Sequence, residues 1–255
     1  MTTEDYEKVI STICEWGDRI VGEAGKAADI GVKKRWLTEF DVAIERAIAH
    51  EIAQLPGKHV LFAEEEHTTA PEGESIWILD PVSSTISFIR GIPLFSTVIS
   101  HVINGVTVFA AVYDPNRKEL FTASKGVGAF LGDKKIKVEE PTSDLFVHCM
   151  PAHKSFSKER CIDIYSSLLD LGSVRMSGMS EGLAYAYVAC GRYSGAVGGN
   201  IDVFPAWAGR LLVEEAGGCF TDFAGDALTF DPHGTVSGSH NIHARLLEIS
   251  RSFKY

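Results

Sequence analysis

Residues 77–88 of this chain read Trp77-Ile78-Leu79-Asp80-Pro81-Val82-Ser83-Ser84-Thr85-Ile86-Ser87-Phe88. The apolar start of this stretch predicts a short β-strand, which Asp80-Pro81 ends. Ligands of open α/β sheets bind beyond the strand ends, so Asp80 is a candidate functional carboxylate. Ser83 and Ser84 are weak candidates for nucleophiles, because no nearby histidine offers a base and an ordinary serine-rich loop is the simpler interpretation.

Further carboxylates stand at similar places in the chain. Glu64 and Glu65 follow a strand candidate at residues 59–62. Asp202 comes directly before a helical pattern, and Asp41 lies in the first turn of a predicted helix. Asp41 and Asp202 also suit a purely structural role at a helix N-terminus. As a set, the acids predict a site for a hard cation such as Mg²⁺, which prefers oxygen ligands.

The apolar pattern on both sides of this stretch predicts a mixed α/β fold with helices packed on sheets. Helices are expected at residues 4–23, 38–52, 158–171, 180–190 and 203–216. Strands are expected at residues 59–62, 77–79, 97–103, 106–113, 120–122, 129–131 and 145–149. Asn104-Gly105 predicts a hairpin, because both residues tolerate positive φ. A polar segment at residues 139–143 predicts a boundary between two lobes, residues 1–142 and residues 143–255.

The composition of the chain argues against several classes of function. The chain has 255 residues, of which 45% are hydrophobic and 23% charged, which is typical of a globular protein. Its net charge of −10 argues against binding of nucleic-acid polymers or anionic membranes. No apolar run reaches the length of a membrane span, and the acidic N-terminus lacks the apolar core of a secretory signal. The five cysteines are scattered, so we expect reduced thiols and a cytoplasmic location. Neither the cysteine nor the histidine spacing supports zinc.

Several segments, taken in order, resemble the signatures of the inositol monophosphatase family. Residues 77–88 resemble its W-I-[IL]-D-P-[IL]-D-G-T-x-N-F signature. The other matching segments are Thr38-x-x-Asp41, Ala63-Glu64-Glu65, Val112-Tyr113-Asp114-Pro115, residues 125–130, Ile201-Asp202, Ala208-Gly209 and residues 213–218. The resemblance covers nearly the whole chain. It implies an α/β (α+β) fold class, a layered αβαβα sandwich, and commonly a homodimer.

The resemblance also implies metal ligands. Glu64, Asp80 and the backbone carbonyl of Val82 would hold a first Mg²⁺, with Glu65 beside it as a further carboxylate. Asp80 and Asp202 would hold a second Mg²⁺. The N-terminal lobe would then carry most of the metal-site carboxylates. The C-terminal lobe would contribute Asp202 and the substrate-facing segment.

Catalytic roles follow from the same resemblance. Thr85, paired with Asp41, would help to activate a water molecule next to the metal that Glu64 holds. The amides of Ser84 and Thr85 would donate hydrogen bonds to phosphate oxygens. The residues that would face the substrate are Ser83, Ser84, Thr85 and Asp202.

The chain departs from the family pattern at important positions. Ser83 stands where the family has an aspartate, and a hydroxyl lacks the charge of a carboxylate, so we expect weaker binding of the second metal. Ser84 replaces a glycine, which costs stability if that position needs positive φ. Ser87 stands where the family usually has asparagine. The segment at residues 191–200 is shorter than in the family and lacks its substrate-binding glutamate.

Two functions follow from these observations. The first is a Mg²⁺-dependent phosphomonoester hydrolase that acts on a small phosphorylated polyol, sugar or nucleotide by metal-activated attack of water. The alternative is a catalytically impaired homologue that binds an anion or a partner, because Ser83-Ser84 replaces the family's Asp-Gly. The retained carboxylates favour the first function.

Overall fold

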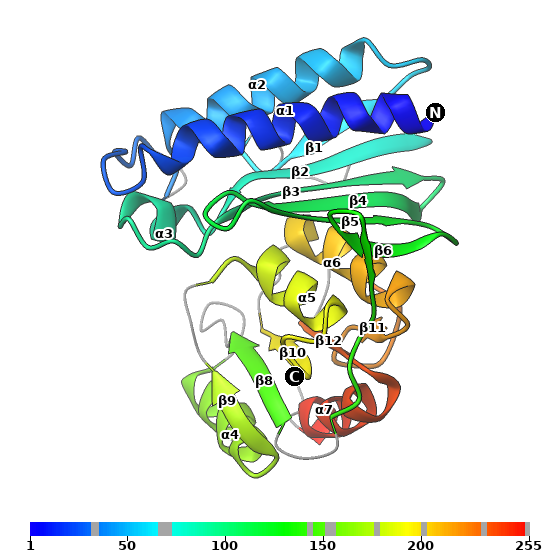
Figure 1. The fold of residues 1–255 in the computed structure, drawn as a ribbon. Coiled ribbons are helices and arrows are strands. Elements are labelled where there is room, and N and C mark those ends of the chain that lie inside the picture. The colour runs from blue at the N-terminus through cyan, green and yellow to red at the C-terminus, as the bar shows by residue number, and fades with distance from the viewer. Residues whose placement is uncertain are drawn as a thin grey trace.

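The computed structural model describes residues 1–31, 36–65, 73–141, 145–150, 157–175, 179–199, 203–230 and 234–252. These residues form five layers, in the order helices, sheet, helices, sheet, helices (Figure 1). The αβαβα sandwich expected from the sequence is therefore confirmed.

The first layer consists of two helices, α1 (Thr3–Val21) and α2 (Glu39–Ala53). Each begins with a capping box, in which a threonine and an aspartate three residues later satisfy one another's backbone amides. The pairs are Thr2 with Asp5 and Thr38 with Asp41. The helix start predicted at residue 38 is confirmed, and its capping box has aspartate in place of the usual glutamate. The apolar sides of both helices pack on the first sheet in one hydrophobic cluster.

The first sheet follows the order of the chain, from β1 to β7. Its strands are β1 (Val60–Ala63), β2 (Ser75–Ser83), β3 (Ser96–Ile103), β4 (Val106–Asp114), β5 (Glu119–Ser124), β6 (Gly128–Leu131) and β7 (Lys134–Ile136). Only β1 and β2 pair in parallel, and the other neighbours are antiparallel. The predicted hairpin joins β3 to β4, with φ of 49° at Asn104 and 76° at Gly105. A short helix, α3 (Thr85–Ile89), follows β2 directly.

The middle layer holds α5 (Glu181–Ala189) and α6 (Val203–Glu215). All nine residues of α5 are buried, because sheets cover this layer on both sides. A helix that is apolar nearly all round suits such a position. Gly191 and Gly217 follow these helices at φ of 76° and 84°, which confirms the helix ends predicted there.

The second sheet has the strand order β11-β12-β10-β8-β9. Its strands are β8 (Leu145–Met150), β9 (Gly172–Arg175), β10 (Gly195–Gly198), β11 (Cys219–Thr221) and β12 (Thr235–Gly238). The last layer covers its outer face with α4 (Lys158–Leu169) and α7 (His240–Ser252) (Figure 1).

The largest hydrophobic cluster crosses the middle of the molecule. It joins Ile78 and Phe121 of the first sheet to Leu183 of α5 and Trp207 of α6. The predicted lobe boundary after residue 142 lies outside the described residues, and the division into two lobes stays a prediction. Among the helices of the described ranges, none is long and apolar enough to cross a membrane.

Candidate functional site

Two carboxylates meet at one edge of the first sheet. β1 and β2 run in parallel with Ala63 opposite Leu79, and the amide of Glu64 donates to the carbonyl of Leu79 at 3.1 Å. Glu64 is the first residue after β1, and the same register places it level with Asp80 of β2. β2 continues to Ser83, so the strand end predicted at Asp80-Pro81 is wrong; the pairing with β1, which stops at Ala63 and Leu79, is what brings together two acids sixteen positions apart in the chain. Asp80 is almost fully buried, with 2% of its surface exposed.

Asp41 joins these acids from the helical layer above the sheet. The amide and hydroxyl of Thr38 both donate to Asp41 Oδ2, at 2.8 and 2.5 Å. Burial raises the pKa of the Asp41 carboxyl to about 7, although the Thr38 hydrogen bonds act in the opposite direction. The charges of Glu65 and Glu64 raise this pKa further, so Asp41 lies within their electrostatic reach. Asp41 Oδ1 is buried and has no hydrogen-bond partner within the described ranges.

The turn between β2 and α3 has a backbone shape that glycine favours. Ser84 lies in the left-handed region, at φ 68° and ψ 55°. The loss of stability expected for a residue other than glycine at a positive-φ position therefore applies to Ser84. Ser84 Oγ lies 2.8 Å from Ser87 Oγ, so two serines that depart from the family signature contact each other.

Hydroxyl groups hold the carbonyls of this turn. Thr85 Oγ1 donates to the carbonyl of Val82 at 2.9 Å, and Thr97 Oγ1 donates to the carbonyl of Pro81 at 2.8 Å. A β-bulge interrupts the pairing of β2 with β3 between Asp80 and Ser83. Bulges re-aim side chains and are common beside active sites.

The donor set at this edge fits a hard cation. It consists of the carboxylates of Glu64 and Asp80 with the nearby carbonyl of Val82, and Mg²⁺ prefers oxygen ligands of this kind. A buried carboxylate such as Asp80 needs compensating partners, which a divalent cation supplies. The structure contains no group of three or more His, Cys, Asp or Glu side chains in metal-binding geometry within the ranges it describes. Asp202, the predicted ligand of a second metal, lies outside those ranges.

Ser83 lies next to residues that no sequence motif identified. It is 3% exposed and pairs across the strands with Ser96. Ser96 Oγ lies 2.7 Å from Ser180 Oγ, and Ser180 is the N-cap of α5. A buried row of serines thus connects the turn after β2 to the middle helical layer. The helix at residues 180–190 was predicted, but no local signal reports a contact between positions 84 residues apart.

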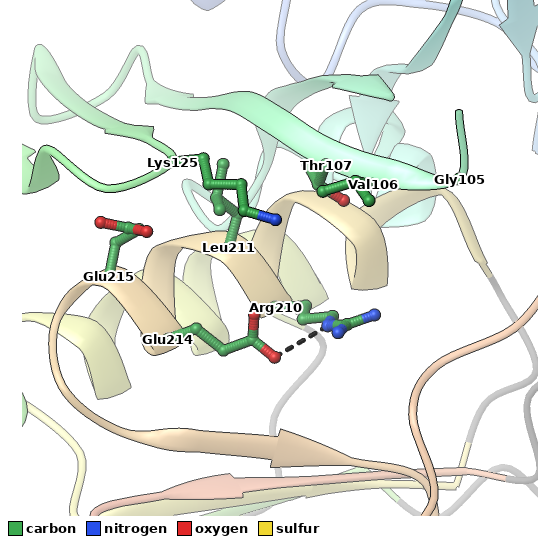
Figure 2. Close-up of a pocket in the computed structure, with 8 residues that line it drawn as sticks. All are labelled: Gly105, Val106, Thr107, Lys125, Arg210, Leu211, Glu214 and Glu215. Carbon is green, nitrogen blue, oxygen red and sulfur yellow. Dashed lines mark hydrogen bonds and ion pairs between the residues drawn. The ribbon is translucent and has the colours of Figure 1, made fainter. Parts of the chain in front are cut away.

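A small cavity of about 150 Å³ lies at the opposite end of the first sheet. Thr107 and Leu211 lie in its wall, and Lys125 extends over them from the turn between β5 and β6 (Figure 2). Arg210 Nε donates to Glu214 Oε1 at 2.8 Å beside this cavity. None of the described acids predicted as metal ligands contributes to its lining.

Comparison with known proteins gives consistent results. The model of the inositol monophosphatase family matches residues 7–254. The Nus factor SuhB of Xylella fastidiosa is 34% identical over 209 residues, which cover 79% of this chain and 74% of that protein. The inositol-1-monophosphatase of Rhizobium meliloti is 27% identical over 250 residues, which cover 94% of each chain.

Solved structures match over almost the whole chain. The Thermotoga maritima inositol monophosphatase superposes with a TM-score of 0.85 at 26% identity, covering 98% of both chains. The extragenic suppressor protein SuhB of Bartonella henselae superposes with a TM-score of 0.87 at 25% identity, covering 98% of this chain and 99% of the other.

Proposed function

Because the chain belongs to the inositol monophosphatase family, we propose that it is a Mg²⁺-dependent hydrolase of small phosphomonoesters. Its substrate is a phosphorylated polyol, sugar or nucleotide. Relatives named inositol-1-monophosphatase support the reaction class. A homodimer in the cytoplasm is part of the same proposal and rests on the family resemblance and the scattered cysteines.

One observation carries this proposal more than any other. The parallel pairing of β1 with β2 brings Glu64 beside Asp80, and α2 holds Asp41 within electrostatic reach of Glu64. Two acids at one edge of the sheet and a third on the helix above it repel one another unless a cation or protons compensate. A cofactor cation relieves this repulsion and creates a binding site for an anionic substrate.

The proposed ligands of the first Mg²⁺ are Glu64, Asp80 and the carbonyl of Val82, with Glu65 nearby. Asp80 and Asp202 are the proposed ligands of the second Mg²⁺. Bound Mg²⁺ would neutralise the phosphate and lower the pKa of a water that it coordinates.

The residues of the chain supply positioning and proton transfer. Asp41 Oδ1 accepts a hydrogen bond from the attacking water, since Thr38 holds the other oxygen of that carboxylate. Thr85, kept in place by its bond to Val82, orients the same water and helps Asp41 to draw off its proton. The backbone amides of Ser84 and Thr85 donate to phosphate oxygens, and Ser83 faces the phosphate from the end of β2.

A second candidate function is an impaired homologue that binds an anion or a partner protein. Its support is the substitution at Ser83 and Ser84, which removes a carboxylate and places a side chain at φ 68°. Relatives named Nus factor SuhB support a role other than catalysis for this candidate. The retention of Asp41, Glu64 and Asp80 favours the hydrolase.

Phosphate release by the purified chain tests the proposal. The panel comprises inositol, sugar and nucleoside monophosphates and para-nitrophenyl phosphate, each with millimolar Mg²⁺ and with EDTA. We expect turnover that needs Mg²⁺ and falls by about 100-fold or more in Asp80→Asn. Asp170→Asn, which changes an exposed acid after α4, is the matched control and should retain wild-type rates.

Two outcomes contradict the hydrolase. Turnover that continues in EDTA, or that Asp80→Asn leaves unchanged, removes the role of the metal site. A folded wild-type protein that releases no phosphate from any compound favours the partner-binding candidate instead.

A further inference from the structure

Thr107, the second residue of β4, carries a buried hydroxyl group. The residue is 7% exposed, and its Oγ1 has no hydrogen-bond partner among the residues that the structure describes. Burying a hydroxyl without a hydrogen bond lowers stability, so native proteins rarely leave one in this state. Valine has nearly the same shape and would avoid the loss, so the hydroxyl at this position needs an explanation.

The side chain of Thr107 lines the small cavity at the far end of the first sheet. Thr107 pairs with Val102 of β3, and the register of the two strands shifts directly beside this pair. Such irregularities re-aim side chains and are common beside binding sites. The cavity, of about 150 Å³, lies between β4 and α6, whose buried Leu211 forms an apolar part of its wall (Figure 2). The unpartnered hydroxyl therefore borders a space that a small molecule can enter.

Charged groups of both signs line the same cavity. Lys125 extends over α6 from the turn after β5, and it forms no ion pair within the described ranges (Figure 2). Arg210 Nε donates to Glu214 Oε1 at 2.8 Å, and Glu215 Oε1 accepts from the amide of Gly126 at 2.7 Å. Each of the two carboxylates thus has one oxygen engaged by the protein. An ammonium group and the remaining carboxylate oxygens border one small space.

This pattern of charges favours one class of ligand. A simple anion would pair with Lys125, but the carboxylates of Glu214 and Glu215 would repel it. A simple cation would pair with these carboxylates, but Lys125 and Arg210 would repel it. A small zwitterion carries both charges and presents each of them to a group of the opposite sign. The α-amino acids have this chemistry.

We propose that this cavity binds a small α-amino acid. The carboxylate of the ligand accepts hydrogen bonds from Thr107 Oγ1 and Lys125 Nζ, while its ammonium group donates to the carboxylates of Glu214 and Glu215. Its side chain lies against Leu211. The cavity shares no lining residue with the proposed phosphate site, so the inference holds whether or not the chain is a hydrolase.

Titration of the isotope-labelled full chain with L-alanine, followed by amide NMR spectra, tests the proposal. We expect saturable shifts at the amides of Thr107 and Gly126, with a Kd on the order of 1 mM for so small a ligand. The amide of Ser84, at the proposed phosphate site, should not shift. Propionate lacks the ammonium group and ethylamine lacks the carboxylate, so each should bind about 10-fold more weakly or less than L-alanine.

Two variants and two matched controls complete the design. Thr107→Val and Lys125→Gln should each raise the Kd for L-alanine about 10-fold, because each removes a hydrogen bond to the ligand carboxylate. Thr122→Val on β5 and Lys134→Gln on β7 make the same changes away from the cavity and should leave the Kd unchanged. Urea unfolding without ligand should show no loss of stability in Thr107→Val, since the hydroxyl that it removes has no described partner.

Three outcomes overturn the proposal. If L-alanine causes no saturable shift at Thr107 and Gly126, the hydroxyl of Thr107 meets only water in this cavity. If Thr107→Val and Lys125→Gln both bind L-alanine like the wild type, the ligand binds elsewhere. If propionate or ethylamine binds as tightly as L-alanine, the site does not select a zwitterion.

Discussion

Ser84 carries a backbone conformation that costs a residue other than glycine about 1 kcal/mol or more. Its hydroxyl lies within hydrogen-bond distance of Ser87, which offsets part of this cost. The neighbouring Ser83 is buried and uncharged. At the scale of single residues, this turn therefore keeps the expected backbone shape while the negative charge next to it is reduced.

Replacing Ser83 by aspartate should restore a ligand for the second metal. We expect Ser83→Asp to lower the Mg²⁺ concentration for half-maximal activity by about tenfold, or to raise kcat, because a carboxylate binds Mg²⁺ more tightly than a hydroxyl does. Titration of activity with Mg²⁺ measures the change. Ser124→Asp, which adds the same charge on β5, serves as the control. An unchanged Mg²⁺ dependence and rate in Ser83→Asp would count against an impaired second site.

At the scale of elements, α1 and α2 begin with the same kind of capping box, but the aspartates of the two boxes have different roles. Thr2 and Asp5 cap α1, whereas Thr38 and Asp41 cap α2. Asp5 is a structural cap with no other assigned role. The capping bonds of Asp41 also hold its Oδ2 and leave Oδ1 without a described partner. The cap of α2 therefore orients a proposed catalytic carboxylate.

This difference predicts different effects of the same substitution. Thr38→Ala and Thr2→Ala should each lower the free energy of unfolding by about 1 kcal/mol, because each removes an N-cap side chain. Only Thr38→Ala should also lower kcat, by about tenfold or more, since it frees Asp41 to turn. Urea unfolding and phosphate release measure the two effects. Equal activity in both variants would show that the cap does not position Asp41 for catalysis.

At the scale of the whole molecule, the middle of the sandwich buries a histidine. His148 lies on β8, 2% exposed, with its ring centroid 5.5 Å from that of Tyr193. Neither ring nitrogen has a hydrogen-bond partner in the part of the chain that the structure describes. Burial lowers the pKa of His148 from 6.5 to about 4. The folded protein therefore keeps this ring neutral at pH values where the unfolded chain protonates it.

The consequence is a loss of stability in acid. Between pH 6.5 and pH 4 the unfolded state binds more protons at His148 than the folded state, so the free energy of unfolding falls as the pH falls. His148→Phe should remove a contribution on the order of 2 kcal/mol to the difference between pH 7 and pH 4. Urea unfolding at several pH values measures this slope. His50→Phe, at an exposed position of α2, should leave it unchanged, and an equal slope in His148→Phe would contradict the prediction.

Elements with strong local signals were predicted well, and those without were missed. The hairpin at Asn104-Gly105 and the cap at Thr38 follow from the conformations that these residue types prefer. The prediction omitted α3, β7, β9, β10, β11, β12 and α7. β10 illustrates the reason, because Gly195 and Gly198 disfavour a strand locally and the pairing with β8 and β12 imposes one.

The sequence alone determined the family, the layered fold and the identity of the candidate carboxylates, because spaced motifs and local periodicity are properties of the chain itself. The tertiary structure decided which groups meet. Parallel pairing of β1 with β2 brings Glu64 beside Asp80, and packing of α5 on β3 places Ser180 Oγ 2.7 Å from Ser96 Oγ. Such contacts join positions far apart in the chain, and their geometry depends on how whole layers pack, which no local pattern encodes.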